Sequence, residues 1–141
     1  MPPPGTDTDN SDDVFDIDPA ALARAEAALA DLSGRYLAWA EADMLRLEAC
    51  LTEILAAPDG RAAGLKLLFG IAHDMKGQGA TFDYPLVSDL GNRLCRLVES
   101  DAAPGPEHLA SIAALVAGIG RVIRERISGD GGELGRVLLG E

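Results

Sequence analysis

The stretch that is most informative about the fold and function of this chain is Ala72-His73-Asp74-Met75-Lys76-Gly77. It lies in residues 62–82, a mostly apolar run of small residues that predicts a helix. On a helix, offsets of three and four residues return to the same face. His73, Lys76 and Gly77 are therefore expected to share one patch of surface, which combines an imidazole, a cation and a position with no side chain.

A helical wheel separates this patch from the expected core. With His73 at zero and about 100° per residue, one set of residues clusters near about 220° and predicts the buried face: Leu68, Ala72, Met75, Gly79 and Phe82. His73 lies about 140° from that direction, so its side chain is expected to point outward or to the shoulder of the helix. We call the opposite set the His73 face; its members around His73 are Lys66, Phe69, Gly70, Lys76, Gly77 and Ala80.

Three properties of the His73 face suit a histidine that carries a phosphoryl group and is approached by another protein. Gly70, Gly77 and Ala80 leave little side-chain bulk, although a glycine inside a helix costs about 0.5–1 kcal/mol relative to alanine. The only lysines of the chain, Lys66 and Lys76, both lie on this face and suit a dianionic group. Phe69 is a large apolar residue expected near the surface, which indicates a partner surface.

The rest of the chain predicts an all-α fold. Apolar stripes at helical spacing begin at Leu22, Leu37, Leu86 and Leu109, with an expected break or bend at Ser33-Gly34. No segment alternates like a strand, and the connections are short, so we expect an up-and-down antiparallel helical bundle. The expected organisation is a disordered acidic segment at 1–17, a helical bundle at 18–128 and a Gly-rich tail at 129–141. The apolar patch Val137-Leu138-Leu139 leaves open whether that tail docks as a terminal turn or frays.

Composition limits the function classes. The chain has 141 residues, enough for one domain, and a net charge of −11, which disfavours nucleic acid as a partner. Residues 1–18 hold six aspartates and no basic residue, so 12 basic and 17 acidic residues remain, a net charge of −5. Cys50 and Cys95 are expected to be reduced, half-buried residues with no zinc-site spacing. Without a signal peptide or a stretch that approaches a membrane span in length, the expected location is the cytoplasm.

The segment Ala72–Phe82, followed by an apolar helix through Leu90, Leu94 and Val98-Glu99, resembles the histidine phosphotransfer (HPt) domains of bacterial two-component phosphorelays. The similarity covers roughly residues 35–125 and implies a four-helix bundle with an additional N-terminal helix. It implies that His73 accepts a phosphoryl group from a receiver aspartate and passes it to another receiver. Lys76 would assist the phosphate electrostatically, and Gly77 would clear space for the receiver. Three positions differ from the family pattern. Asp83 stands where many members have glycine, and Gln78 occupies a position where small residues are common. Cys95 lies near the position at which some members have a glutamine that hydrogen-bonds the imidazole.

The resemblance also implies a free-standing, monomeric carrier that is not an enzyme and does not phosphorylate itself. Its partners would be response-regulator receiver domains and a hybrid histidine kinase. No cofactor is expected, because the Mg²⁺ of the reaction would belong to the receiver. The chain has no Gly-rich phosphate loop and no nucleotide-binding motif.

Two other functions stay open. The chain could be a non-phosphorylated interaction or adaptor module whose Phe69 surface docks a partner. It could also be an enzyme with His73 as general base, although a convergent carboxylate is not expected, since Asp74 lies about 100° round the helix. His108 lacks neighbouring glycines and lysines and is expected to be an exposed bystander.

Overall fold

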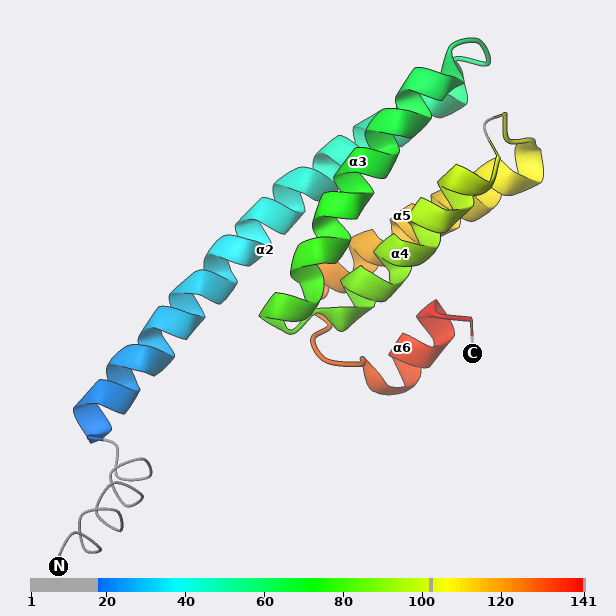
Figure 1. Cartoon of the computed structure of the whole chain (residues 1–141). Helices are drawn as coiled ribbons and strands as arrows, with labels where there is room; N and C mark the ends of the chain where they lie inside the picture. Colours follow the sequence, from blue (N-terminus) through cyan, green and yellow to red (C-terminus); the bar gives the residue numbers. More distant parts are fainter. Residues whose placement is uncertain (1–17, 102, 141) are drawn as a thin grey trace, which may run out of the picture. The chain divides into compact units, whose positions relative to one another are not determined.

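The computed structural model describes residues 18–101 and 103–140. Every regular element in these residues is helical, which confirms the all-α class (Figure 1). The segment predicted to be disordered, 1–17, lies outside the described residues. The elements in chain order are α2 (Pro19–Ala56), α3 (Arg61–Gly79), the 3-10 turn η1 (Ala80–Phe82), α4 (Pro85–Ser100), α5 (Pro106–Arg124) and α6 (Gly132–Leu138).

Helix α2 runs further than the sequence predicts. The backbone N–H of Ala20 donates to Asp18 Oδ1 over 3.4 Å, and Pro19 occupies the first helical position. The expected break at Ser33-Gly34 is wrong, because the helix continues to Ala56. Gly34 has nothing within 4 Å of the place where a Cβ would stand, so its only cost is about 1 kcal/mol of helix propensity. Among the described residues, the N-terminal part of the chain therefore forms no separate additional helix, because it is continuous with the rest of α2.

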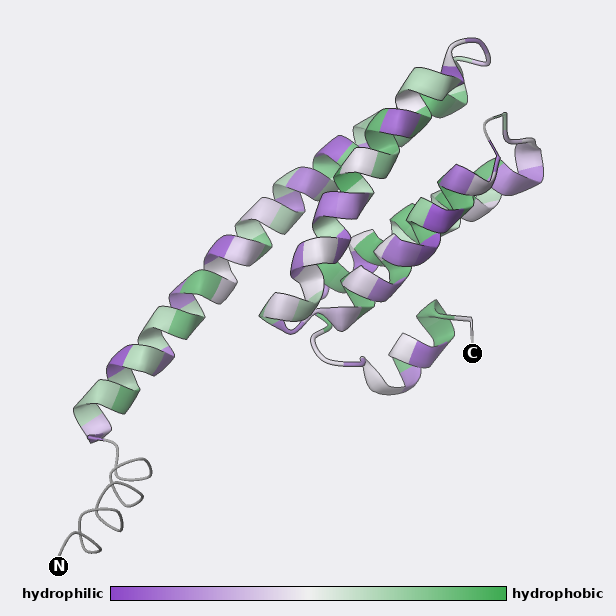
Figure 2. Ribbon diagram, viewed as in Figure 1, coloured by the Kyte–Doolittle hydropathy of each residue, from purple (hydrophilic) through white to green (hydrophobic). Residues whose placement is uncertain are grey.

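The chain divides after Arg35 into two compact units. The described residues of the first unit are the start of α2, where Leu22, Leu29 and Leu32 are exposed and Arg35 forms an ion pair with Asp31 over 3.1 Å. Figure 2 shows hydrophobic and hydrophilic residues alternating along α2, as expected of an amphipathic helix. The second unit, from Tyr36 on, holds the core and the candidate site.

The core of the second unit combines residues from α2, α3, α4 and α5. Helix α3 packs against α4, and α4 packs against α5. Each helix buries one stripe, as the spacing predicts. The fully buried side chains include Met44 and Leu47 of α2, Leu68 and Ala72 of α3, Leu90 and Leu94 of α4, and Ile112, Ile119 and Ile123 of α5.

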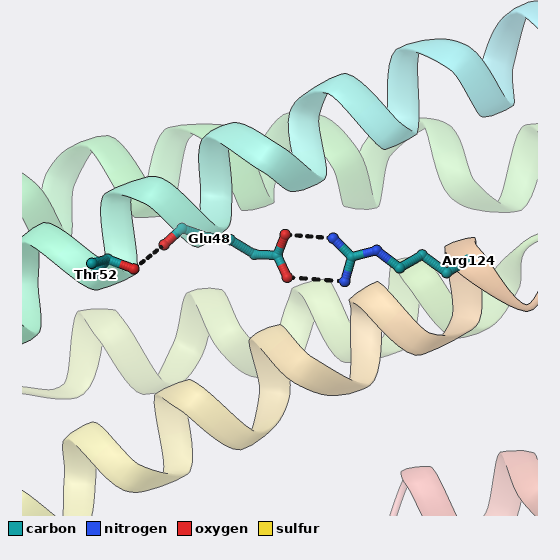
Figure 3. A network of polar contacts seen from close by, with 3 residues as sticks. All are labelled: Glu48, Thr52 and Arg124. Carbon is teal, nitrogen blue, oxygen red and sulfur yellow. Dashed lines mark hydrogen bonds and ion pairs between the residues drawn. The ribbon is translucent and has the colours of Figure 1, made fainter.

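Polar contacts join α2 to its neighbours, including Arg61 Nε of α3, which donates to the Ile54 carbonyl over 2.9 Å, and Arg126, which pairs with Glu41 over 3.2 Å. The Cys50 thiol donates to the Gly64 carbonyl of α3 over 3.2 Å. The Arg124 guanidinium of α5 binds both carboxylate oxygens of Glu48, and Thr52 Oγ1 donates to the Glu48 carbonyl over 3.0 Å (Figure 3). The hydrogen bonds from Arg124 lower the pKa of Glu48. This bidentate pair joins one turn of α2 to the last turn of α5.

An aromatic cluster closes the C-terminal end of α3. Tyr36 is buried and stacks on Phe82, with ring centroids 4.8 Å apart, and on Tyr84, with centroids 5.6 Å apart. Asp83 follows Phe82 in a left-handed conformation with φ of 67°, and its carbonyl accepts the Gly129 N–H over 2.9 Å. This turn reverses the chain into α4.

The Gly-rich tail contains a short helix. Helix α6 begins after Gly131, whose φ of 71° favours glycine. Leu138 and Leu139 pack against the core, and the Arg93 guanidinium of α4 donates to the Leu139 carbonyl. Leu138 and Leu139 therefore belong to a docked helical turn, one of the two outcomes left open by the sequence, whereas Val137 is 62% exposed.

Helix α5 is a longer apolar segment than the sequence analysis expected anywhere in the chain. Its 19 residues are long and apolar enough to cross a membrane by length and composition alone. The sequence-based statement that no stretch approaches such a length is therefore wrong. The apolar stripe of α5 is buried in the core at Ile112, Val116, Ile119 and Ile123, which is the ordinary reason for such composition in a packed helix.

Candidate functional site

His73 lies on the exposed side of α3. Its side chain is 58% exposed, while the preceding residue, Ala72, lies on the core side of the helix and is fully buried. This orientation agrees with the helical wheel. The imidazole stacks on the Phe69 ring one turn earlier, with centroids 5.9 Å apart and planes 26° apart. Phe69 itself is half-buried against the core, so it supports the ring from one side and leaves the other open.

One carboxylate comes nearer to His73 than the helical wheel suggested. Asp74 Oδ1 lies 4.0 Å from His73 Nδ1, and the Asp74 side chain is 79% exposed. This distance is too long for a hydrogen bond. Asp74 therefore does not hold the imidazole as the carboxylate of a catalytic triad would.

The glycines near His73 fall into two groups. A Cβ at Gly70 or Gly77 would meet nothing within 4 Å, so no packing in the described part of the chain requires their lack of a side chain. A Cβ at Gly79 would lie 2.7 Å from the Tyr84 carbonyl oxygen, and one at Gly91 of α4 would lie 2.9 Å from Lys76 Cβ. Gly79 and Gly91 therefore permit close packing, whereas Gly70 and Gly77 leave open space beside the imidazole.

Lys76 is held by α4. Its Nζ donates to Asn92 Oδ1 over 3.2 Å, and the Lys76 side chain is half-buried. Ser88 Oγ donates to the Lys76 carbonyl over 2.6 Å and accepts the Ala80 N–H over 3.0 Å. The end of the His73 helix is thus clamped by side chains of α4, and Ala80 is exposed at the start of η1.

Two hollows border the His73 face. One, of about 240 Å³, is mainly apolar and is lined by Ala62, Leu65, Lys66, Phe69, Val98 and Glu99. The other, of about 450 Å³, lies on the Gly70 side and is lined by Arg46, Ala63, Lys66, Leu67, Gly70, Ile71 and Asp74. Lys66 is exposed and borders both. Arg46 of α2 also lines the hollow beside Gly70, and its guanidinium pairs with Asp43 over 3.2 Å.

Cys95 does not take the place of an imidazole-binding glutamine. Its thiol is buried and lies 3.9 Å from the Phe69 carbonyl oxygen, behind the ring that supports His73. Burial raises the pKa of the Cys95 thiol, and burial also raises that of Cys50. Both cysteines are free and more deeply buried than the sequence suggested, so they act as small apolar residues.

His108 has a structural contact that the sequence did not predict. Its Nε2 lies 2.6 Å from the Leu97 carbonyl, an acceptor, so this nitrogen carries the proton. The ring is half-buried and satisfies a carbonyl in the last turn of α4. His108 is therefore better described as a helix-capping residue than as an exposed bystander.

Sequence reasoning missed Arg46, Ser88, Gly91 and Asn92. Each lies 15 to 27 residues from His73 along the chain and reaches the site only through the register of packed helices. Tyr36 is buried, whereas Trp39 on the same helix is exposed. Among the described residues no group of three or more His, Cys, Asp or Glu side chains could hold a metal ion.

A scan of protein-family models gives no match to this chain, and searches of curated proteins and of solved structures give no significant match either. The functional argument therefore depends on the residues and geometry of the His73 face.

Proposed function

We propose that this protein is a phosphorelay histidine phosphotransfer protein that accepts a phosphoryl group on His73 and passes it to a second receiver domain. The observation that carries the proposal is the open surface on which His73 lies. Its imidazole is 58% exposed, and Gly70 and Gly77 have no neighbours within 4 Å of a virtual Cβ. Two glycines that packing does not require, beside one histidine, are explained by the close approach of a macromolecule.

The proposed fold of the carrier is an antiparallel up-and-down four-helix bundle made of the second part of α2 with α3, α4 and α5. The short connections at residues 57–60, 83–84 and 101–105 favour antiparallel neighbours. The shared core of these four helices and the Glu48–Arg124 pair between α2 and α5 are consistent with this topology.

In the proposed reaction, a lone pair on an imidazole nitrogen attacks the phosphorus of a receiver aspartyl phosphate. The P–N bond forms as the P–O bond to the aspartyl carboxylate breaks, and the carboxylate leaves with that electron pair. Nε2 is the nucleophile in this proposal, because it is the ring nitrogen farther from the α3 backbone and from Asp74, whose Oδ1 lies 4.0 Å from Nδ1. Lys76 supplies positive charge for the phosphoryl oxygens, and the Mg²⁺ would come with the receiver.

This carrier would work in the cytoplasm as a monomer, between a hybrid histidine kinase and response-regulator receivers. It would need no cofactor and no ATP of its own. Such a role asks the protein for positioning and charge, with little covalent chemistry.

The test is transfer from a phosphorylated receiver to the purified full chain. Wild type and His108→Gln should acquire an acid-labile, base-stable phosphoryl group, and His73→Gln should acquire none while unfolding at the same temperature as wild type. Labelling of His73→Gln, or loss of labelling in His108→Gln without loss of stability, would contradict the assignment of His73.

The second candidate function is a non-phosphorylated interaction module, favoured by the apolar hollow lined by Leu65, Phe69 and Val98. On this alternative, partner binding depends on Phe69, survives His73→Gln, and is accompanied by no labelling of wild type. The same labelling experiment therefore separates the two functions.

A further inference from the structure

Three neighbouring positions of α4 hold the turn of α3 that carries Lys76. Ser88, Gly91 and Asn92 lie at offsets of three and four and so share one face of α4. Ser88 Oγ binds the Lys76 carbonyl over 2.6 Å, and Asn92 Oδ1 accepts from Lys76 Nζ over 3.2 Å. Gly91 lets the helices approach, because its Cβ would lie 2.9 Å from Lys76 Cβ. One face of α4 thus determines both the backbone position and the ammonium position of Lys76.

The chemistry of the Asn92 side chain matters as much as its place. An amide oxygen accepts a hydrogen bond from the ammonium but carries no charge to cancel it. No carboxylate in residues 18–101 and 103–140 lies within ion-pair distance of Lys76. Lys76 is therefore ordered and still fully available as a positive charge, in a chain whose net charge is −11.

Lys66 provides an internal contrast. It is the only other lysine and also lies on the His73 face, but it is exposed, whereas Lys76 is half-buried. Lys66 also has no ion-pair partner within the described part of the chain. The two lysines thus differ in whether another helix holds the ammonium in place.

We propose that Asn92 is a positioning residue: it fixes the Lys76 ammonium one turn from His73 and leaves its charge free for the phosphoryl group. This inference rests on the proposed function and adds a residue of α4 to it. It predicts that an aspartate at position 92, which has the same shape, would be worse than alanine, because it would pair with Lys76 and neutralise it.

The contact is tested first without any phosphoryl chemistry. In the ¹⁵N-labelled full chain, the side-chain ammonium signals of the two lysines are assigned with Lys66→Arg. We expect Asn92→Ala to move the Lys76 Nζ signal toward that of Lys66 and to leave the Lys66 signal unchanged. An unchanged Lys76 signal would overturn the inference whatever the function of the protein.

The role is tested with phosphoramidate, a small donor that needs no docking surface. We expect Lys76→Ala and Asn92→Ala to slow labelling of His73 by about three- to five-fold. The double variant should be no slower than Lys76→Ala alone, because Asn92 acts through the lysine. Asn92→Asp should be slower than Asn92→Ala.

The outcomes separate this inference from the proposed function. If wild type is labelled at His73 but Asn92→Ala is as fast as wild type, or slows Lys76→Ala further, Asn92 is not a positioning residue and the carrier function stands. If neither phosphoramidate nor a phosphorylated receiver labels His73 in wild type, the proposed function fails and the role of Asn92 fails with it. Thermal unfolding of Asn92→Ala within a few degrees of wild type excludes a merely structural effect.

Discussion

The open turn around His73 and the seam between α3 and α4 use the same residue type for opposite purposes. At the seam, Gly79 and Gly91 are required because a Cβ would come within 3 Å of another atom. Around His73, Gly70 and Gly77 have empty space where a Cβ would stand. A glycine within a helix destabilises it by up to about 1 kcal/mol in either place. Packing within this chain offsets that destabilisation only at the seam.

This difference shows how a partner-binding surface can be recognised without comparing related sequences. A glycine that packing explains says nothing about partners. A helix glycine with no neighbours is unexplained by the fold, and two of them flank the one exposed imidazole of α3. The four predictions below test this comparison, beginning with the largest expected effect.

The seam should be intolerant of even a methyl group. Gly91→Ala should lower the free energy of unfolding by about 1–2 kcal/mol, because overpacking outweighs the gain in helix propensity. Gly70→Ala is the matched control and should raise it by up to about 1 kcal/mol. Urea unfolding of both variants measures the two values. Equal effects at the two glycines would break the comparison.

The open turn should tolerate bulk in the isolated protein and resist it in a complex. Gly77→Gln should not reduce the free energy of unfolding, since almost any residue exceeds glycine in helix propensity. Transfer from a receiver should nevertheless fall about ten-fold or more, because the side chain displaces the docked partner from His73. Labelling by phosphoramidate should change much less. If Gly77→Gln unfolds the protein, the glycine serves packing after all; if receiver transfer is unaffected, the receiver does not dock over this turn.

The contact between α2 and α5 is a third case, in which a half-exposed ion pair joins two helices. The Arg124 hydrogen bonds lower the pKa of Glu48, so the unfolded chain binds a proton there more readily than the folded chain. Stabilisation by the pair is present above the ordinary glutamate pKa of about 4.3 and is lost as the pH falls below it. The side chains are 38% and 52% exposed, so Glu48→Gln should cost only about 0.5–1 kcal/mol near neutral pH. Denaturation at pH 7 and pH 3 should show this difference shrinking in acid; a difference that grows in acid would contradict the sign.

The turn at Asp83, which follows η1 and precedes α4, should show the smallest change in stability. Asp83 adopts a φ of 67°, a region that favours glycine. Asp83→Gly should therefore raise the free energy of unfolding by about 0.5 kcal/mol, after the greater conformational entropy of glycine in the unfolded chain is subtracted. The melting temperature should rise slightly. Gly129→Ala, at a φ of 63°, is the matched opposite and should lower it. A higher melting temperature for Gly129→Ala would show that the positive φ at position 129 does not strain an alanine.

The helical character and the orientation of His73 could be predicted from the sequence because both depend on local spacing. A period near 3.6 distinguishes the buried Leu68, Ala72 and Met75 from His73 without any knowledge of neighbouring helices.

Features that depend on the register between helices could not be predicted. Asn92 meets Lys76 only because α4 returns beside α3 with Gly91 at the contact, and nothing in the spacing of 16 residues indicates this. Gly34 was misread for a different reason: the sequence signals a weak point, but a cost of about 1 kcal/mol does not end a helix that continues on both sides. Arg46 was missed because its place beside Gly70 depends on how α2 lies along α3.

The buried aromatic stack gives the protein an optical response to alkali. Burial raises the pKa of the Tyr36 hydroxyl to about 12, well above the value of about 10 for tyrosine in an unfolded chain. The neutral phenol is therefore favoured in the folded state, and stability is present below pH 10 and declines as the pH rises toward 12. Phenolate absorption near the ultraviolet edge should consequently develop late and steeply, since ionisation of Tyr36 and opening of the stack on Phe82 and Tyr84 promote each other.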